Sequence, residues 1–200
     1  MSATTLSIEN MHLHGDLFAN LFRARRESFI VRKKWLLPEA DGMEFDQYDT
    51  PASRWIAVHQ ENKVLAGVRL MPTTTRLGMY SYMIRDAQRG MLESIPSNLL
   101  DVDAPVDPLI WEATRIFVST DVPAKERILV QSDLMQELIT AARSLGAKQL
   151  LAFGPAIWPR WMARLRLSAQ PTGPVLLLDG VRVQTALMDL NAQPIPQRLI

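Results

Sequence analysis

The chain contains no cysteine, and this absence excludes disulfide bonds, thiolate metal sites and cysteine nucleophiles. It also lacks an excess of charge of either sign, since 22 Lys and Arg residues stand against 21 Asp and Glu. A nucleic-acid-binding protein usually carries a marked basic excess, so that class is disfavoured. No apolar run approaches the roughly 20 residues of a membrane-spanning helix. The first residues lack a basic start and an apolar segment, so we predict no signal peptide and a cytoplasmic protein.

The length and the apolar content point to one globular domain. Two hundred residues with 48% hydrophobic content are enough for a single core of ordinary size. The sequence has no internal repeat and no stretch resembling a linker between domains. We therefore predict a single domain over residues 1–190 and a tail over residues 191–200, where two prolines occur among few apolar residues.

The first predicted helix, over residues 15–35, places an arginine on an apolar face. Phe18, Phe22, Arg25 and Phe29 recur at the three-to-four-residue spacing of one helix face. An arginine on such a face needs a partner or a ligand. The alternative is an arginine at the edge of the face whose charged end reaches solvent. Both interpretations remain open from the sequence.

The helix is expected to end after Trp35, and an acidic segment follows. Residues 38–52 contain two prolines, one glycine and five acids, and they predict a loop, either ordered or mobile. Carboxylates such as Glu44, Asp46 and Asp49 are rarely buried without partners. Together with the preceding aromatic residues, they are better interpreted as the wall and floor of a site for a small ligand that carries both charge signs.

The middle of the chain predicts a hairpin and a crossover. Arg54–His59 and Val64–Met71 alternate as two antiparallel strands. Further along, Leu109–Val118, a helix over 124–145 and Gln149–Phe153 predict a β-α-β unit. The two strands of such a unit are parallel.

The remaining elements complete a fold prediction. A short helix is expected within Tyr82–Leu92, and another begins near Pro159. Val175–Leu178 and Val181–Leu187 flank Asp179-Gly180, the commonest signal for a short hairpin. The order of helix, antiparallel strands, crossover, helix and hairpin predicts an α/β protein with a three-layer GNAT-like (acyltransferase) fold. In this fold a central mixed sheet is flanked by helices.

Two predicted strands that are otherwise apolar contain charged residues. Arg69-Leu70-Met71-Pro72-Thr73-Thr74 ends one strand, and Trp111-Glu112-Ala113-Thr114-Arg115-Ile116-Phe117 lies in another. A buried glutamate and arginine are costly unless they are paired or used. Strict alternation would place Glu112 and Arg115 on opposite faces. Either a bulge brings them together, or one belongs to a buried ion pair and the other lines a pocket.

These motifs together resemble the signature of the acyl-homoserine-lactone synthases, also called autoinducer synthases. The family pattern is Arg, Phe and Trp, then Glu-x-Asp-x-Tyr-Asp, then Arg-Leu-x-Pro-Thr-Thr, then Trp-Glu-x-Ser/Thr-Arg-x-Phe. The matching residues, in chain order, are Arg25, Phe29, Trp35, Glu44, Asp46, Tyr48, Asp49, Arg69, Glu112, Thr114 and Arg115. The resemblance covers about residues 10–190. The segment between Thr75 and Trp111 is longer than in a typical member.

The resemblance implies an acyltransferase that makes a bacterial quorum-sensing signal. Its substrates would be S-adenosylmethionine (SAM) and an acyl thioester, supplied by acyl carrier protein or by coenzyme A. The amine of SAM would attack the thioester, and the SAM carboxylate would then attack its own γ-carbon. This step closes the lactone and releases methylthioadenosine. No tightly bound cofactor and no metal are expected, since neither step needs one.

The resemblance also implies a set of residues that bind SAM. Carboxylates would offset the sulfonium and ammonium groups, arginines would hold anionic groups by paired hydrogen bonds, and aromatic faces would pack on the adenine or the sulfonium. The residues expected to do so are Arg25, Phe29, Trp35, Asp46, Asp49 and Arg69.

Two further residues are expected to act in catalysis. Glu112 is the candidate base for the amine proton, directly or through water, and Arg115 would set its charge and orientation. The alternative is a buried Glu112–Arg115 pair that fixes the register of the strand.

The sequence gives weaker evidence for the pocket that would bind the acyl group. Trp111, Phe117, Met135 and Trp158 are candidates for an acyl pocket, although such residues also suit an ordinary core. No glycine occurs between Val118 and Ile128, so the usual acetyl-CoA pyrophosphate loop is absent.

A basic cluster in the C-terminal half suggests a partner surface. Its members are Arg143, Lys148, Arg160, Arg164 and Arg166. They could attract an acidic carrier protein, or they could be ordinary solvated charges.

Two other functions compete with the synthase. One is a GNAT-type N-acyltransferase acting on another small amine, and the acids at 44–49 speak against it because such an enzyme needs no sulfonium site. The other is a non-catalytic ligand-binding relative, and the presence of Glu112 and Arg115 speaks against it.

Overall fold

The computed structural model describes residues 1–194, which fall into two compact units. The first unit comprises Met1–Leu70 and Arg115–Ala141, and the second comprises Met71–Thr114 and the described residues from 142 onward. Of the predicted tail, residues 195–200 lie outside the described part, and 191–194 form no helix or strand. The prediction of a single domain over 1–190 stays a prediction.

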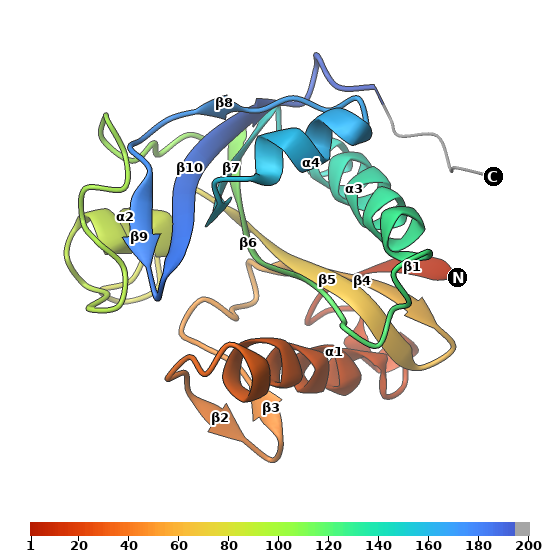
Figure 1. Cartoon of the computed structure of the whole chain (residues 1–200). Coiled ribbons are helices and arrows are strands. Elements are labelled where there is room, and N and C mark those ends of the chain that lie inside the picture. Colours follow the sequence, from red (N-terminus) through yellow and green to blue (C-terminus); the bar gives the residue numbers. More distant parts are fainter. Residues whose placement is uncertain (195–200) are drawn as a thin grey trace. The chain divides into compact units, whose positions relative to one another are not determined.

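The first unit contains an antiparallel sheet in the order β1-β4-β5 (Figure 1). Strand β1 (Ser2–Leu6) pairs with β4 (Arg54–Gln60), and β4 pairs with β5 (Lys63–Pro72). The predicted hairpin is therefore confirmed. Strand β1 was not predicted, because Ser-Ala-Thr-Thr-Leu is short and has no clear apolar alternation. The last part of β6 (Ile110–Val118) adjoins β5, and directly after it the Ser119 amide donates to the Leu65 carbonyl oxygen over 2.7 Å.

The predicted helix over 15–35 consists of two parts. The α-helix α1 (Leu17–Arg26) continues as a π-helical segment, η2 (Glu27–Arg32). Its apolar face packs against the sheet and joins Trp55 in a hydrophobic core, to which Leu17, Leu21, Phe22 and Phe29 contribute. The predicted apolar face is confirmed, and the change to π-helix was not predicted because apolar spacing of three and four residues does not distinguish the two helix types.

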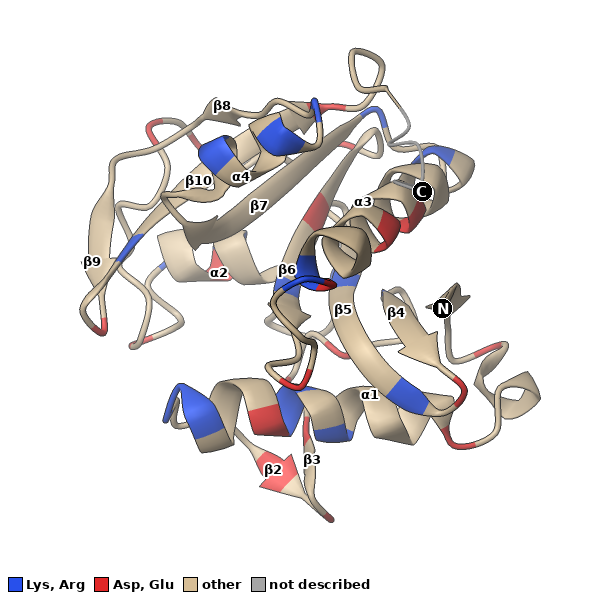
Figure 2. Cartoon of the chain, turned by 45° about the vertical axis from the view of Figure 1, so that its right-hand side comes forward, with Lys and Arg blue, Asp and Glu red and all other residues tan. Residues whose placement is uncertain are grey.

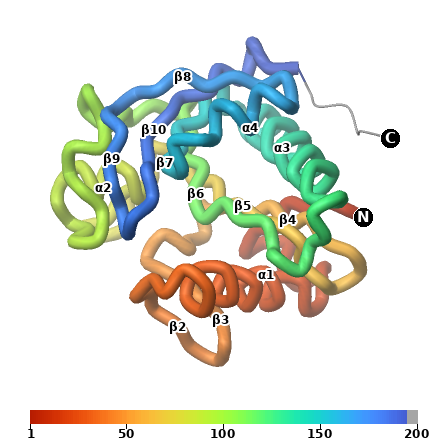
Figure 3. The backbone as a smooth tube through the Cα atoms, in the orientation of Figure 1, coloured from red at the N-terminus to blue at the C-terminus, as the bar shows by residue number. Residues whose placement is uncertain are grey.

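The predicted loop over 38–52 contains a small hairpin that packs against α1 (Figure 3). Strand β2 (Glu39–Ala40) pairs with β3 (Met43–Glu44). Asp41 and Gly42 form the turn with φ of 50° and 72°, the left-handed conformation that two-residue hairpin turns require. Strands of two residues are too short for a sequence pattern, so only the Asp-Gly pair could have indicated them.

The second unit contains a mixed sheet. The first part of β6 pairs in parallel with β7 (Gln149–Pro155), which pairs antiparallel with β10 (Val181–Asp189). Strand β10 also pairs antiparallel with β8 (Gln170–Pro171) and β9 (Leu176–Leu178). Asp179 and Gly180 form the β9–β10 turn with φ of 49° and 76°. These pairings confirm the predicted parallel strands and the closing hairpin.

Helices connect these strands where the sequence predicted them. Helix α3 (Arg127–Ser144) links β6 to β7, α4 (Trp158–Arg164) has a proline in its first turn, and α2 (Met83–Gln88) lies within the expected range. A 3-10 turn, η1 (Met11–Leu13), precedes α1. No helix among residues 1–194 is long and apolar enough to span a bilayer.

Candidate active site

Six charged side chains of the first unit form a closed ring in which arginines and carboxylates alternate. We call it the charged ring. Its members, in order around the ring, are Arg25 on α1, Glu44 on β3, Arg115 on β6, Asp46 in the loop after β3, Arg69 on β5 and Asp49 in the same loop. Each arginine contacts two carboxylates and each carboxylate contacts two arginines. Three positive charges therefore balance three negative ones.

Arg25 makes the most complete contacts of the ring. Its Nη1 and Nη2 atoms donate to the two carboxylate oxygens of Asp49 over 2.7 and 2.9 Å. Its Nε atom donates to Glu44 Oε2 over 2.7 Å. Such paired, charge-assisted hydrogen bonds are stronger than neutral ones and fix the geometry of both partners. Only 1% of Arg25 is exposed, so the interpretation as an edge arginine that reaches solvent was wrong.

Arg69 and Arg115 close the other half of the ring. Arg69 Nη1 lies 2.5 Å from Asp46 Oδ1 and 3.1 Å from Asp49 Oδ1. Arg115 Nη2 donates to Asp46 Oδ2 over 2.7 Å, and its Nε lies 3.3 Å from Glu44 Oε1. The acids that the sequence grouped as a ligand wall are thus matched by arginines that come from three different elements.

Local backbone structure positions the two aspartates. The Tyr48 amide donates to Asp46 Oδ1, and the Asp46 amide donates to Asp49 Oδ2, both over 2.9 Å. The side chain of Trp55 adds a hydrogen bond from Nε1 to Asp49 Oδ1, also over 2.9 Å. Asp residues favour such turns because a short carboxylate can accept from nearby backbone amides.

The ring is not buried evenly. The side chains of Arg69 and Glu44 are 0% exposed and that of Arg25 is 1% exposed. Asp46 and Asp49 are 5% and 6% exposed, and Arg115 is 10% exposed. The ring therefore has a fully buried side and a slightly less buried edge, which consists of Asp46, Asp49 and Arg115 and which we call the accessible edge.

The arginines keep the two aspartates of the ring ionised. Burial alone would raise the pKa of Asp49, but Arg69, Arg25 and the hydrogen bonds that Asp49 accepts lower it well below its usual range. The pKa of Asp46 is lowered in the same way, since Arg69 and Arg115 outweigh the effect of burial. Burial would lower the pKa of Arg25, but Asp49 and Glu44 raise it above its ordinary value. Asp46, Asp49 and Arg25 therefore carry their charges at neutral pH.

Glu112 and Arg115, which the sequence considered together, have different described partners. Arg115 adopts φ 55°, a left-handed conformation that interrupts the alternation of β6, and it pairs with Glu44 and Asp46. Glu112, in the second unit, is fully buried and caps α2: its Oε1 accepts from the Ile84 amide over 2.7 Å. Its Oε2 accepts from the Met83 amide over 3.3 Å. These are among the amide groups that a helix N-terminus leaves without intrahelical partners. The role of Arg115 in orienting Glu112 stays a prediction.

The two aromatic residues expected to bind SAM are stacked on each other. The ring centroids of Phe29 and Trp35 lie 5.3 Å apart with an interplanar angle of 7°. The chain reverses after η2 because Lys34 adopts φ 59°, and the Trp35 amide then donates to the Phe29 carbonyl oxygen over 3.0 Å. Phe117, expected in the acyl pocket, meets Phe29 edge-on with centroids 5.9 Å apart.

The other acyl-pocket candidates occupy packed positions. Trp111 is 7% exposed and Met135 is 3% exposed. The ring of Trp158 lies so close to Gly154 that a Cβ added there would come within 2.3 Å of it. Trp111 and Met135 pack as core residues do, whereas Trp158 is partly buried, and the assignment of all three to an acyl pocket stays a prediction.

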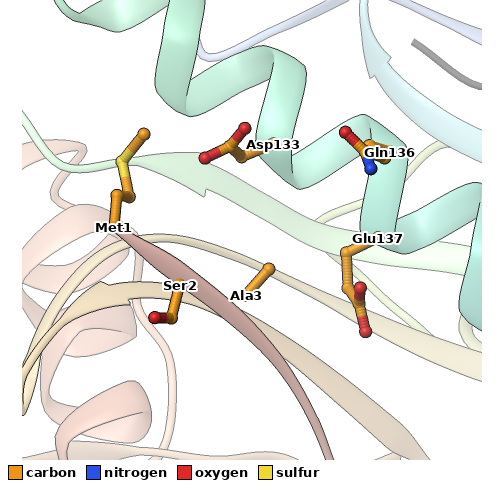
Figure 4. Close-up of a pocket in the computed structure, with 6 residues that line it drawn as sticks. All are labelled: Met1, Ser2, Ala3, Asp133, Gln136 and Glu137. Atoms are coloured by element: carbon orange, nitrogen blue, oxygen red, sulfur yellow. The ribbon is translucent and has the colours of Figure 1, made fainter. Parts of the chain in front are cut away.

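A surface pocket of about 290 Å³ lies in the first unit between β1 and α3, and its lining includes no residue that the sequence singled out (Figure 4). Its lining residues are Met1, Ser2, Ala3, Asp133, Gln136 and Glu137. Thr5 donates a hydrogen bond to Glu137 over 2.8 Å, so the Glu137 side chain already has a partner within the fold.

The basic cluster is exposed apart from one member. Lys148, Arg160, Arg164 and Arg166 are exposed, and the two on α4 appear as its blue segments in Figure 2. Arg143 instead donates to the backbone carbonyl oxygens of Leu190 and Gln193, which ties α3 to the chain after β10.

Sequence reasoning missed two contributors to the site. Trp55 supplies the indole hydrogen bond to Asp49, yet in the sequence it is only the second residue of an apolar strand. Lys33 places its ammonium over the rings of Phe29 and Trp35. The only signal for Lys33 is its position between the two aromatic residues.

Comparison with solved structures first defines the class. A crystal structure of an acyl-CoA N-acyltransferase from Pseudomonas aeruginosa matches with a TM-score of 0.59 and 15% identity, covering 94% of this chain and 99% of that one. At this identity the likeness concerns the fold alone. It confirms the predicted GNAT-like acyltransferase fold.

Comparison of sequences then gives the family. The model of the family described as autoinducer synthase matches residues 9–165, well over half of the chain. The chain therefore belongs to the autoinducer synthase family, and the predicted enzyme class, an acyltransferase of the acyl-homoserine-lactone synthase type, is confirmed.

Individual relatives agree with this assignment. The chain is 26% identical over 190 residues to the isovaleryl-homoserine lactone synthase of Bradyrhizobium diazoefficiens, covering 94% of this chain and 80% of the relative. It is 27% identical over 172 residues to the acyl-homoserine-lactone synthase of Pseudomonas aeruginosa, covering 84% and 77%. The structure of BjaI, a CoA-dependent acyl-homoserine lactone synthase with SAM and isopentyl-CoA, matches with a TM-score of 0.77 and 26% identity, covering 97% and 86%.

Proposed function

We propose that this chain makes an N-acyl-homoserine lactone from SAM and an acyl thioester, and that the charged ring and the Phe29–Trp35 stack form its SAM site. The observation that carries the proposal is the charged ring with its accessible edge, in a member of the autoinducer synthase family. The presence of SAM and isopentyl-CoA in the BjaI structure supports both substrate classes.

The proposed reaction balances without any group beyond the two substrates and a base. The SAM ammonium loses a proton, its nitrogen bonds to the thioester carbonyl carbon, and the carbon–sulfur bond breaks to release the thiol. The SAM carboxylate oxygen then bonds to its own γ-carbon. The bond from this carbon to the sulfonium breaks, and its electron pair neutralises sulfur in the methylthioadenosine that leaves.

Because the ring members are buried unevenly, we assign some of them to direct contact with SAM and others to indirect roles. Asp46, Asp49 and Arg115 form the accessible edge, so we assign them to direct contact with SAM. The two aspartates would face its cationic groups, and Arg115 would face its carboxylate. Arg25 and Arg69 are buried behind this edge, and in our proposal they bind SAM only indirectly, by holding Asp46 and Asp49 in place.

The aromatic stack would supply the rest of the SAM site. A sulfonium, like an ammonium, is attracted to the faces of Trp and Phe rings. Trp35 is only partly buried, so its ring offers the accessible surface of the stack, whereas Phe29 is 1% exposed.

Glu112 remains our candidate for the base that takes the amine proton, directly or through water. Its two hydrogen bonds from α2 fix the orientation of the carboxylate, which a general base needs. The same bonds support the competing role, in which Glu112 only anchors α2.

The acyl donor could reach the protein on either carrier. The exposed basic residues Lys148, Arg160, Arg164 and Arg166 suit an acidic carrier protein, whereas the relative BjaI is a CoA-dependent synthase. SAM and acyl thioesters are cytoplasmic metabolites, so the proposed reaction takes place in the cytoplasm.

The test is a product assay. Purified protein is given SAM with a panel of acyl-CoA and acyl-carrier-protein donors, and mass spectrometry follows methylthioadenosine and acyl-homoserine lactone. We expect both products in equal amounts with at least one donor. An amide without ring closure across the whole panel would instead identify an N-acyltransferase on another small amine. Binding of SAM with no product from any donor would identify a non-catalytic relative.

A further inference from the structure

Lys33 occupies the aromatic surface that the proposed SAM site would use. Its Nζ atom lies 4.5 Å from the centre of the Trp35 ring and 4.9 Å from the centre of the Phe29 ring. Both distances fall within the roughly 6 Å over which a cation is attracted to a ring face. A cation of the chain itself therefore lies where a cationic ligand would bind.

This lysine lacks the counterion that the arginines of the charged ring have. Among the described residues, Lys33 takes part in no ion pair. Burial of the ammonium lowers the pKa of Lys33, and the positive charge of the nearby Arg115 lowers it further. Among the described residues, the aromatic faces of Phe29 and Trp35 are thus the main groups that stabilise the positive charge of Lys33.

Phe29 has no free surface for a ligand while this arrangement persists. Only 1% of the residue is exposed, with Trp35 stacked on it, Phe117 at its edge, and the cations of Lys33 and Arg115 over its ring. A ligand that reaches Phe29 must displace one of these neighbours.

The four neighbours differ in how easily they can leave. Phe117 is buried in the core, Arg115 is paired with two carboxylates, and Trp35 is tied to Phe29 by a backbone hydrogen bond. Lys33 is exposed as a residue, has a flexible four-carbon stem and makes no ion pair. It is the neighbour whose departure costs least.

From this geometry we infer that Lys33 is a specificity-determining residue that competes with the ligand cation for the faces of Phe29 and Trp35. The inference rests on the proposed SAM site. In the free chain Lys33 covers the aromatic stack, and SAM must displace it. Because the displaced ammonium stays tethered nearby, it repels the positively charged substrate SAM more than the neutral product methylthioadenosine.

The consequence is a measurable difference between two ligands. Removing the Lys33 charge should strengthen SAM binding by removing both the competition and the repulsion. It should strengthen methylthioadenosine binding less, since only the competition is removed. The ratio of the two affinities therefore reports the role of Lys33 separately from any general change in the site.

The experiment measures the dissociation constants of SAM and methylthioadenosine by calorimetry for the wild type and three variants. Lys33→Met removes the charge, Lys33→Arg keeps it, and Lys34→Met removes a neighbouring charge that has no described ring contact. In Lys33→Met we expect SAM to bind roughly 3- to 30-fold more tightly and methylthioadenosine to gain less. Lys33→Arg and Lys34→Met should stay near the wild-type ratio. Melting temperatures confirm that each variant is folded.

The failures are distinguishable. If the wild type binds SAM and Lys33→Met binds it equally, or if Lys34→Met gains as much, the competition does not exist and the inference is overturned. Weaker SAM binding in Lys33→Met would show that Lys33 holds the substrate instead, which also overturns it. If the wild type binds neither nucleoside, the proposed SAM site fails, and the inference falls with it.

Discussion

The charged ring of the first unit and Glu112 of the second unit bury carboxylates in different ways. In the ring, each carboxylate is balanced by two arginines that come from distant parts of the chain. At Glu112, the described partners are two neutral backbone amides of one short helix. A buried charge needs compensation in either case. In an ion pair each partner offsets the buried charge of the other, whereas a backbone amide carries no charge and only stabilises the carboxylate. Loss of one ring member therefore leaves two charged neighbours underpaired, while loss of Glu112 removes an acceptor from two backbone amides.

The largest effect on stability is expected from breaking the ring. Arg25→Met removes the partner of two buried carboxylates and should lower the free energy of unfolding by about 3–5 kcal/mol. The matched control is Arg26→Met, the next residue of α1, whose ion pair with Glu39 is partly exposed and should matter by about 1 kcal/mol or less. Denaturant unfolding measures both. Equal losses in the two variants would show that the ring is no more than a set of ordinary ion pairs.

Glu112→Gln tests the other side of the comparison. If Glu112 is the base, turnover should fall by roughly 10²–10⁴. The amide keeps one acceptor oxygen, so the stability should fall by only about 1–3 kcal/mol. Turnover and melting temperature are measured on the same preparations.

Asp86→Asn is the control for Glu112→Gln. Asp86 is also fully buried in the second unit and accepts from the Ser81 amide over 2.8 Å, but it has no proposed role in the chemistry. It should lose comparable stability and keep its turnover per folded molecule. Parallel losses of activity and stability in both variants would assign Glu112 to anchoring α2.

The accessible edge of the ring predicts a smaller, ligand-specific effect. Asp49→Asn and Asp46→Asn remove a charge that we assign to SAM contact, and each should weaken SAM binding by about 1.5–3 kcal/mol. Glu44→Gln removes a charge from the closed side of the same ring. It should reduce stability without a comparable loss of SAM affinity. Equal loss of affinity in all three variants, by calorimetry, would contradict the division of the ring into two sides.

The smallest expected effect is a dependence of stability on pH. The pKa of Asp49 is lowered from its ordinary value of 3.8 in the folded chain, so its contribution to stability is fully present above that value. The contribution is lost as the pH falls below about 4 towards the lowered pKa, because the unfolded chain then binds the proton more readily. Asp49→Asn should lose less stability than the wild type between pH 5 and pH 3. Parallel pH profiles would show that the arginines do not perturb Asp49.

The sequence predicted the elements whose patterns are long enough to read. Helix α3 and the β4–β5 hairpin show their apolar periodicity over many residues and lie close to the expected bounds. Strand β1 and the β2–β3 pair escaped, because five polar-rich residues and two pairs of residues contain no period.

For the site, the sequence identified the residue types but not the pairing. Motifs singled out Arg25, Asp49 and Arg69, yet assigned their charges to a ligand rather than to one another. Which carboxylate meets which arginine depends on where α1, β5 and β6 lie in space, and that information is not local. The left-handed conformation of Arg115 is a further example, since no residue type in Ala-Thr-Arg-Ile demands it.

The π-helical segment η2 has a consequence for how sequences of this kind can diverge. A π-helical turn holds one more residue than an α-helical turn over the same hydrogen-bonded step. If η2 closed as an α-helix with no residue deleted, every side chain after it would rotate by about 100° around the helix axis. The Arg25 side chain would keep its direction, but the side chains of Phe29 and Trp35 would point in a different direction. The angle around the helix axis between Arg25 and Phe29 therefore depends on η2 remaining π-helical, whereas loss of the one extra residue together with closure of η2 would preserve that angle.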